Sequence, residues 1–175
     1  MHYKTLVLVS IVFLFSKTGY SQSRHESGTK VTNNTLIGSW KIQEIQYQYP
    51  DTTYTMNAND FGRVMFSKNN YSLTYYPYMM PREAFRTLSK PTNEEIVKAF
   101  RSMVFNTGSY TIDTNILTTT ADLAKVPGFE GGKQFYTIEQ KEFLVITMYD
   151  ETYPDGTKPE WFGKLKVRFT LKKEN

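Results

Sequence analysis

The sequence predicts an all-β protein, an eight-stranded antiparallel up-and-down β-barrel with one helix inserted between its third and fourth strands. Two observations lead to this prediction. Eight short segments rich in Tyr, Phe, Ile, Val and Thr are separated by turn residues, and the connections between them alternate between long and short. The chain has 175 residues, 39% hydrophobic and 22% charged, which is enough for one core in one domain.

The first 21 residues are expected to be a signal peptide. Lys4 precedes an apolar run from Leu6 to Phe15, and the small residues Gly19 and Ser21 place cleavage before Gln22. The run is shorter than the roughly 20 residues that a membrane span needs. We therefore expect a periplasmic or secreted protein with no integral membrane segment after cleavage.

The order of elements follows from the residue pattern. Residues 22–35 are polar and are expected to form a flexible lead-in, and 36–172 are expected to form the barrel domain. We expect the eight strands at 38–49, 61–67, 71–76, 108–113, 116–121, 133–139, 142–150 and 162–172. In the first strand, Trp40 and Ile42 share one face but Ile45 and Tyr47 share the other, so a bulge is expected near Glu44.

One helix is expected after Pro91. Thr92 and Glu95 form a capping box, which satisfies free backbone amides at a helix start. The helix should end near Asn106 and carry one apolar stripe, made of Ile96, Phe100, Met103 and Val104. We expect this stripe to dock on the end of the β-structure.

The connections indicate how the strands are arranged. Long connections are expected at 50–60, 77–107, 122–132 and 151–161, and short turns lie between them. In an up-and-down arrangement, alternate connections lie at the same end. All long connections should therefore gather at one end, and closure into a barrel would hide the sheet edges. A two-sheet sandwich is the alternative, but it usually has long connections at both ends.

Several motifs resemble a known family. Gly38-Ser39-Trp40 at the start of the first strand resembles the lipocalin or calycin signature. Segments 62–71, 108–113 and 126–131 resemble, in the same order, the hairpin, strand and Pro/Gly loop of bacterial lipocalin-like domains. The resemblance spans about 36–172 and implies a lipocalin-like barrel. It also implies that Trp40 and Arg168 pack together and close one end.

The chain departs from this family pattern at two places. A histidine that often follows the second of these strands is replaced within 117–120, and an arginine that follows the Pro/Gly loop appears as Gln134. Polar chemistry that those two groups perform in relatives cannot be carried over to this chain.

Few residues suggest catalysis or metal binding. Cysteine is absent, and the two histidines, His2 and His25, precede the predicted barrel, so thiol catalysis, a Ser-His-Asp triad, haem and zinc are disfavoured. Carboxylates between Asp150 and Asp155 could bind calcium, but a solvated loop is the favoured interpretation. The net charge falls from +4 to +2 when two lysines leave with the signal, which argues against nucleic acid as a partner. We expect no cofactor, no metal and no catalytic residue.

The positive signal is the set of aromatic residues predicted at the long-connection end. Tyrosine offers an apolar ring and one hydroxyl, which suits a pocket for a flat or lipidic ligand. Arg63 and Arg101 are candidate partners for a ligand carboxylate. The residues predicted to bind the ligand are Tyr47, Arg63, Tyr75, Arg101, Tyr110, Tyr136, Met148 and Trp161.

The leading functional hypothesis is an exported protein that holds a small hydrophobic or amphipathic molecule in the barrel. One alternative is an isomerase or cyclase of a hydrophobic substrate, with tyrosine hydroxyls and Glu44 or Asp113 as the proton-transfer groups. Another is a protein-interaction module that uses the long loops.

Overall fold

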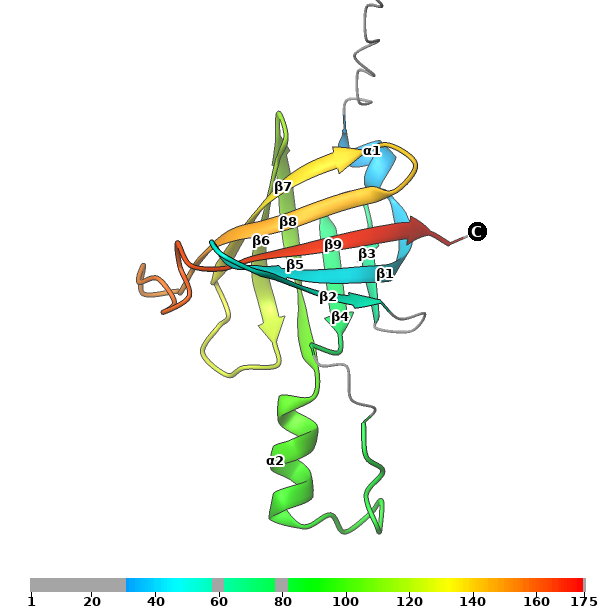
Figure 1. Cartoon of the computed structure of the whole chain (residues 1–175), viewed down its shortest axis with the longest axis vertical. Helices are drawn as coiled ribbons and strands as arrows, with labels where there is room; N and C mark the ends of the chain where they lie inside the picture. The colour runs from blue at the N-terminus through cyan, green and yellow to red at the C-terminus, as the bar shows by residue number, and fades with distance from the viewer. Residues whose placement is uncertain (1–30, 58–61, 78–81, 175) are drawn as a thin grey trace, which may run out of the picture.

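The computed structural model describes residues 31–57, 62–77 and 82–174. It confirms the predicted fold class: eight antiparallel strands close into a barrel, and one extra strand lies outside it (Figure 1). The elements in chain order are α1 (Asn33–Leu36), β1 (Gly38–Gln48), β2 (Thr53–Asn57), β3 (Gly62–Phe66), β4 (Asn70–Tyr75), α2 (Asn93–Arg101), β5 (Val104–Asp113), β6 (Ile116–Ala124), β7 (Lys133–Gln140), β8 (Leu144–Thr152) and β9 (Lys166–Lys173).

The barrel closes where the first and last strands pair. β1 and β9 are antiparallel from Trp40 opposite Lys173 to Gln48 opposite Lys166. The register shifts between Ile42 and Glu44, which confirms the predicted bulge. The extra residue lets both Ile42 and Ile45 face the core, where each is fully buried.

The first connection differs from the prediction. Residues 50–60 were expected to form a long loop, but Tyr49 N donates to Thr52 O at 2.8 Å and the chain turns back as β2. β2 pairs with the second half of β1 and β3 with the first half. The two strands thus follow one another along one edge of β1, and β2 extends the wall at that end.

The remaining connections match the predicted alternation. Tight turns at 67–69, 114–115 and 141–143 lie at one end, which we call the closed end. Longer connections at 76–103, 125–132 and 153–165 lie at the other, which we call the open end. Two of these tight turns join strands in register up to Asp113 opposite Ile116 and Gln140 opposite Leu144.

The closed end is filled by α1 and Trp40. Trp40 Nε1 donates to Leu36 O at 2.7 Å, and Val31 and Leu36 are buried in the core. The last residues of the segment expected to be a flexible lead-in are therefore folded onto the barrel. The rest of that segment and the predicted signal peptide lie outside the described residues.

Helix α2 begins as predicted but does not dock. Thr92 Oγ1 accepts from Glu95 N and Thr92 N donates to Glu95 Oε2, so the capping box is confirmed. The helix ends at Arg101 rather than near Asn106, and no residue in it is buried. Ile96 and Phe100 are each 47% exposed, and the helix projects from the open end of the barrel (Figure 1).

The reason for this difference lies just after the helix. Val104, predicted as part of the helical stripe, instead begins β5 and pairs with Tyr75. Lys125 Nζ donates to Phe100 O at 2.5 Å and to Met103 O, and lies 4.4 Å from the centre of the Phe100 ring. This contact satisfies carbonyls at the helix end without burying the stripe.

Neither of the two helices in the described part of the chain is long and apolar enough to cross a membrane.

Candidate functional site

An inner-face row of side chains links four strands near the open end. Strand pairing places Tyr47 of β1 opposite Val167 of β9, Val167 opposite Met148 of β8, and Met148 opposite Tyr136 of β7. Val167, Met148 and Tyr136 are buried, and Tyr47 is partly buried against the core. Three residues predicted to bind ligand, Tyr47, Tyr136 and Met148, therefore share one row.

At the β1 end of this row lies an aromatic pocket of about 600 Å³. Tyr47 Oη donates to Pro77 O at 2.9 Å, which ties the pocket's wall to the segment after β4. The rings of Tyr49 and Tyr54 meet edge to face, with centres 5.9 Å apart. The lining residues are Tyr47, Tyr49, Thr53, Tyr54, Thr55, Met56 and Pro77.

At the β7 end of the row lies a buried polar cluster centred on Gln134. Gln134 Oε1 accepts from Tyr136 Oη at 2.8 Å and from Asn106 Nδ2 at 3.4 Å. Gln134 Nε2 donates to Glu151 Oε2 at 2.7 Å. These four side chains come from β5, β7 and β8, and the amide of Gln134 connects a tyrosine hydroxyl to a carboxylate.

Two further hydroxyls lie beside this cluster without hydrogen bonds. Tyr71 of β4 and Thr119 of β6 are each only 3% exposed, and their hydroxyl oxygens have no hydrogen-bond partner. Thr119 is the register partner of Gln134, and its hydroxyl lies close enough to those of Tyr71 and Tyr136 to lower the pKa of each, against the larger rise that burial causes. Buried hydroxyls are normally paired, so this pair is unusual.

The electrostatics of the cluster are dominated by burial. Burial raises the pKa of Glu151, the hydrogen bond from Gln134 partly offsets this, and Asp150 adds a smaller rise. Burial also raises the pKa of Tyr71 and, more strongly, that of Tyr136. Both tyrosines therefore keep their protons at neutral pH and can act as hydrogen-bond donors.

Five of the eight residues predicted to bind ligand lie on the inner face near the open end or pack against it. Tyr75 is buried and its ring meets that of Phe169 edge to face, with centres 5.1 Å apart. Trp161, from the connection between β8 and β9, packs partly buried against the core. The five are Tyr47, Tyr75, Tyr136, Met148 and Trp161.

The other three predicted residues lie elsewhere. Tyr110 donates to Ser67 O at 2.9 Å in the turn between β3 and β4, so it belongs to the closed end. Arg63 lies on the outer face, where its Nε forms an ion pair with Glu174 at 2.9 Å. Arg101 is exposed in the last turn of α2. Strand alternation and helix length, which the sequence left open, decide these positions.

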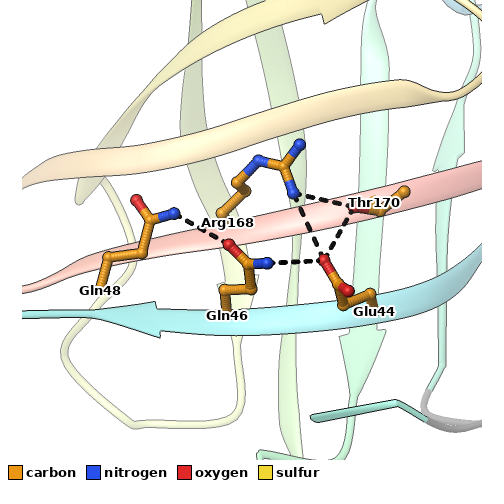
Figure 2. A network of polar contacts seen from close by, with 5 residues as sticks. All are labelled: Glu44, Gln46, Gln48, Arg168 and Thr170. Atoms are coloured by element: carbon orange, nitrogen blue, oxygen red, sulfur yellow. Dashed lines mark hydrogen bonds and ion pairs between the residues drawn. The ribbon is translucent and has the colours of Figure 1, made fainter. Parts of the chain in front are cut away.

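Arg168 also differs from its predicted role. It lies opposite Gln46 on the outer face, whereas Lys173 is the register partner of Trp40 and has its Nζ 5.3 Å from the ring centre. Figure 2 shows Arg168 in a polar network with Thr170 and three side chains of β1; its Nη1 lies 3.4 Å from Glu44 Oε1. Gln46 and Gln48 extend the network along β1. This network joins the first and last strands from outside the barrel.

Sequence reasoning missed most of the polar cluster, and one signal pointed to it. Thr119 and Gln134, which pair across β6 and β7, fall at the two places where the chain departs from the lipocalin-like pattern. Glu151 was assigned to a solvated loop, but it lies in β8 and shares the inner face with Gln134. Among the described residues, no three or more His, Cys, Asp or Glu side chains come together in a group that could hold a metal ion.

The comparisons with known proteins agree with this architecture. A family profile described as a lipocalin-like domain matches residues 37–173, which is most of the chain. The chain belongs to the lipocalin-like domain family. This confirms the resemblance predicted from the first-strand signature and the three later motifs. No protein of curated description matches the chain.

Three solved structures are similar to this lipocalin-like chain. An uncharacterized protein from Bacteroides eggerthii DSM 20697 is 13% identical with a TM-score of 0.41, covering 79% of this chain and 99% of its own. A lipocalin-like protein from Bacteroides uniformis ATCC 8492 is 14% identical with a TM-score of 0.40, covering 79% and 98%. A redesigned β-barrel is 14% identical with a TM-score of 0.38, covering 85% and 100%.

Proposed function

We propose that this protein binds a small apolar or amphipathic molecule at the open end of its barrel. The observation that carries the proposal is the aromatic pocket of about 600 Å³ on the β1–β2 hairpin. Its volume is within the roughly 300–1,000 Å³ typical of small-molecule sites. Tyr47, Tyr49 and Tyr54 supply apolar rings, each with a hydroxyl that can orient a ligand.

We also propose that the binding protein acts outside the cytoplasm, in the periplasm or as a secreted protein. The support is the pattern of residues 1–21, with Lys4, an apolar run and small residues before Gln22. Intact mass spectrometry of the protein recovered from its native host tests this. A mass corresponding to a chain that begins at Gln22 is expected, and a chain that begins at Met1 would contradict export with cleavage.

The enzyme hypothesis receives less support from the side chains. Glu44, one proposed proton-transfer group, faces outward against Arg168, and Asp113 is exposed beside a tight turn. Glu151 is the inward carboxylate near a tyrosine, but Gln134 separates it from Tyr136. We therefore favour binding over isomerisation or cyclisation, because a hydrogen-bonded amide does not transfer protons readily between these groups.

The experiment uses N-phenyl-1-naphthylamine, a flat apolar probe whose fluorescence rises when it leaves water. The variant is Tyr54→Ala, which removes an exposed ring from the pocket's rim. The matched control is Tyr153→Ala in the connection after β8, because Tyr153 is also partly exposed and also meets one ring edge to face, that of Phe129. Of these two tyrosines, Tyr54 lines the pocket and Tyr153 does not.

The proposal predicts saturable fluorescence with the unmodified protein. Tyr54→Ala should weaken probe binding by about fivefold, close to 1 kcal/mol for a lost aromatic contact, and Tyr153→Ala should leave it unchanged. Absence of saturable binding, or equal effects of the two substitutions, would contradict a site in the aromatic pocket.

A further inference from the structure

We propose that the buried polar cluster centred on Gln134, together with the adjacent hydroxyls of Tyr71 and Thr119, receives the polar end of the bound molecule. This end is a hydrogen-bond donor without negative charge, such as a hydroxyl or an amine, and the cluster disfavours a carboxylate. The inference rests on the proposed function and deepens it by naming the class of ligand.

The cluster has hydrogen-bonding capacity that the protein does not use. The hydroxyls of Tyr71 and Thr119 are buried without partners, and an unpaired buried hydroxyl costs about 1–3 kcal/mol. A site that serves only stability would place apolar side chains there, as β9 does with Val167, Phe169 and Leu171. The unused hydroxyls are therefore best explained as groups that a ligand engages.

The charge on the inner face around the cluster is negative. Glu151 contributes a carboxylate, and Asp122 and Glu151 both act on Tyr71 as negative charges. In the strands that the structure describes, the inner-face positions hold no arginine, and the one lysine is Lys173 at the closed end. A ligand carboxylate would meet like charge there with no cation to pair with, which is costly in a buried site.

The two arginines once expected to bind an anion do not change this balance. Arg63 is on the outer face in an ion pair with Glu174, and Arg101 is exposed on α2. By contrast, Glu151 can accept a hydrogen bond from a ligand, since Gln134 occupies only its Oε2. Tyr71 and Thr119 can accept as well as donate. A hydroxyl or an amine can therefore be satisfied by this cluster, whereas a carboxylate would be repelled by the charge of Glu151.

A row of inner-face side chains connects the cluster with the aromatic pocket. Tyr136 donates to Gln134 and also ends the inner-face row that begins at Tyr47 in the pocket. Three strand spacings separate Tyr47 from Tyr136, at most about 14 Å along the wall. The inner positions of β6 beyond Thr119 hold the small side chains of Ala121 and Ala124, and both are buried. A twelve-carbon chain is long enough to join the two places.

The experiment compares three ligands with the same dodecyl tail and different polar ends: dodecanol, dodecylamine and dodecanoate. Each displaces N-phenyl-1-naphthylamine from the full-length mature protein at pH about 8, where the amine is protonated and the carboxylate ionised. We expect dodecanol and dodecylamine to displace the probe at concentrations at least about tenfold lower than dodecanoate, a factor equal to 1.4 kcal/mol.

The decisive variant is Glu151→Gln, which removes the charge and keeps the shape. It should strengthen the binding of dodecanoate and weaken that of dodecylamine, so that the ratio of their displacing concentrations narrows to less than about threefold. The control is Glu139→Gln, the same exchange on the exposed outer face of β7, which should leave the ratio unchanged. If Glu151→Gln does not fold, Tyr71→Phe serves as the second variant and should weaken the binding of dodecanol by about fivefold.

Each outcome decides the question. Equal displacement by the three ligands, or an unchanged ratio in Glu151→Gln, overturns the assignment of the polar end while probe binding still supports the proposed function. If none of the three ligands displaces the probe, the assignment of the polar end is likewise overturned, while probe binding still supports the proposed function. If the naphthylamine probe itself does not bind, the proposed function fails and this inference fails with it.

Discussion

Two buried tyrosines of the inner face should respond in opposite directions to the loss of a hydroxyl. Tyr71→Phe and Tyr136→Phe make the same chemical change at positions that are 3% and 1% exposed. Tyr136 Oη donates to Gln134 Oε1 at 2.8 Å, whereas Tyr71 Oη has no hydrogen-bond partner. The comparison therefore separates a hydroxyl that stabilises the protein from one that does not.

The expected magnitudes follow from these contacts. Tyr136→Phe leaves Gln134 Oε1 with only the 3.4 Å contact from Asn106 Nδ2, and should cost about 1–2 kcal/mol. Tyr71→Phe removes a hydroxyl whose desolvation is not compensated, and should leave stability unchanged or raise it by up to about 1 kcal/mol. The two variants should thus differ by about 2 kcal/mol, or about 4–8 °C in Tm for a chain of this size.

Urea unfolding of protein stripped of bound lipid, followed by circular dichroism, measures the difference. A loss of stability in Tyr71→Phe equal to that in Tyr136→Phe would refute the reasoning, because it would mean that the Tyr71 hydroxyl is already paired in the ligand-free protein. Repeating the measurement with dodecanol should reverse the advantage of Tyr71→Phe, since the ligand would then stabilise the unmodified protein more.

Three more predictions test other parts of the molecule. Burial raises the pKa of Glu151, so the folded state holds this proton more tightly than the unfolded state, and the group lowers stability as pH rises through its folded pKa. In urea titrations from about pH 4 to 8, the stability of Glu151→Gln should therefore rise relative to that of the unmodified protein. A difference in stability that stays constant over this pH range would contradict the prediction. In thermal unfolding, Trp40→Phe should cost about 1–3 kcal/mol, because Leu36 O loses its hydrogen-bond donor. Arg168→Ala should cost less than about 1 kcal/mol, because its ion pair with Glu44 is partly exposed. A larger cost for Arg168→Ala than for Trp40→Phe would restore Arg168 as the residue that closes the barrel. Phe100→Ser should cost less than about 1 kcal/mol in free energy of unfolding, because α2 is not docked and the ring's contact with the Lys125 ammonium is exposed. A loss of about 2 kcal/mol or more would place the ring in a core.

The features that sequence reasoning predicted are those set by local pattern. Segments rich in Tyr, Phe, Ile, Val and Thr between turn residues located the eight barrel strands, and the capping box at Thr92 located the start of α2. The change of face between Ile42 and Ile45 predicted the bulge in β1. Each of these depends on neighbours within a few residues, which is the range over which strand and helix periodicity acts.

The features that it missed depend on register between distant segments. β2 is only five residues long, and Met56 is its one buried residue, so Thr53–Asn57 carries little apolar signal of its own. Arg168 and Trp40 are separated because β9 pairs Lys173, five residues further on, with Trp40. The spacing of residues along one strand does not determine its register with the strand that pairs with it.

The polar cluster was missed for a related reason. The pairing of β7 with β8 shifts between Phe135 and Tyr136, which makes Tyr149 an extra residue in β8. Without this bulge, Met148 and Glu151 would lie on opposite faces, because side chains alternate along a strand. The bulge turns Glu151 inward beside Gln134. The most informative residue of the candidate site is therefore positioned by an irregularity that composition does not reveal.

The most direct test of a ligand site at the open end uses the methionine methyl groups. Met56 and Met148 are buried on the inner face near the open end, whereas Met65 is exposed on the outer face and serves as an internal control. Methyl-labelled protein with dodecylamine should give nuclear Overhauser contacts between the alkyl chain and Met56 and Met148, and none to Met65. Contacts to Met65 alone, or no saturable contacts at all, would contradict binding inside the barrel.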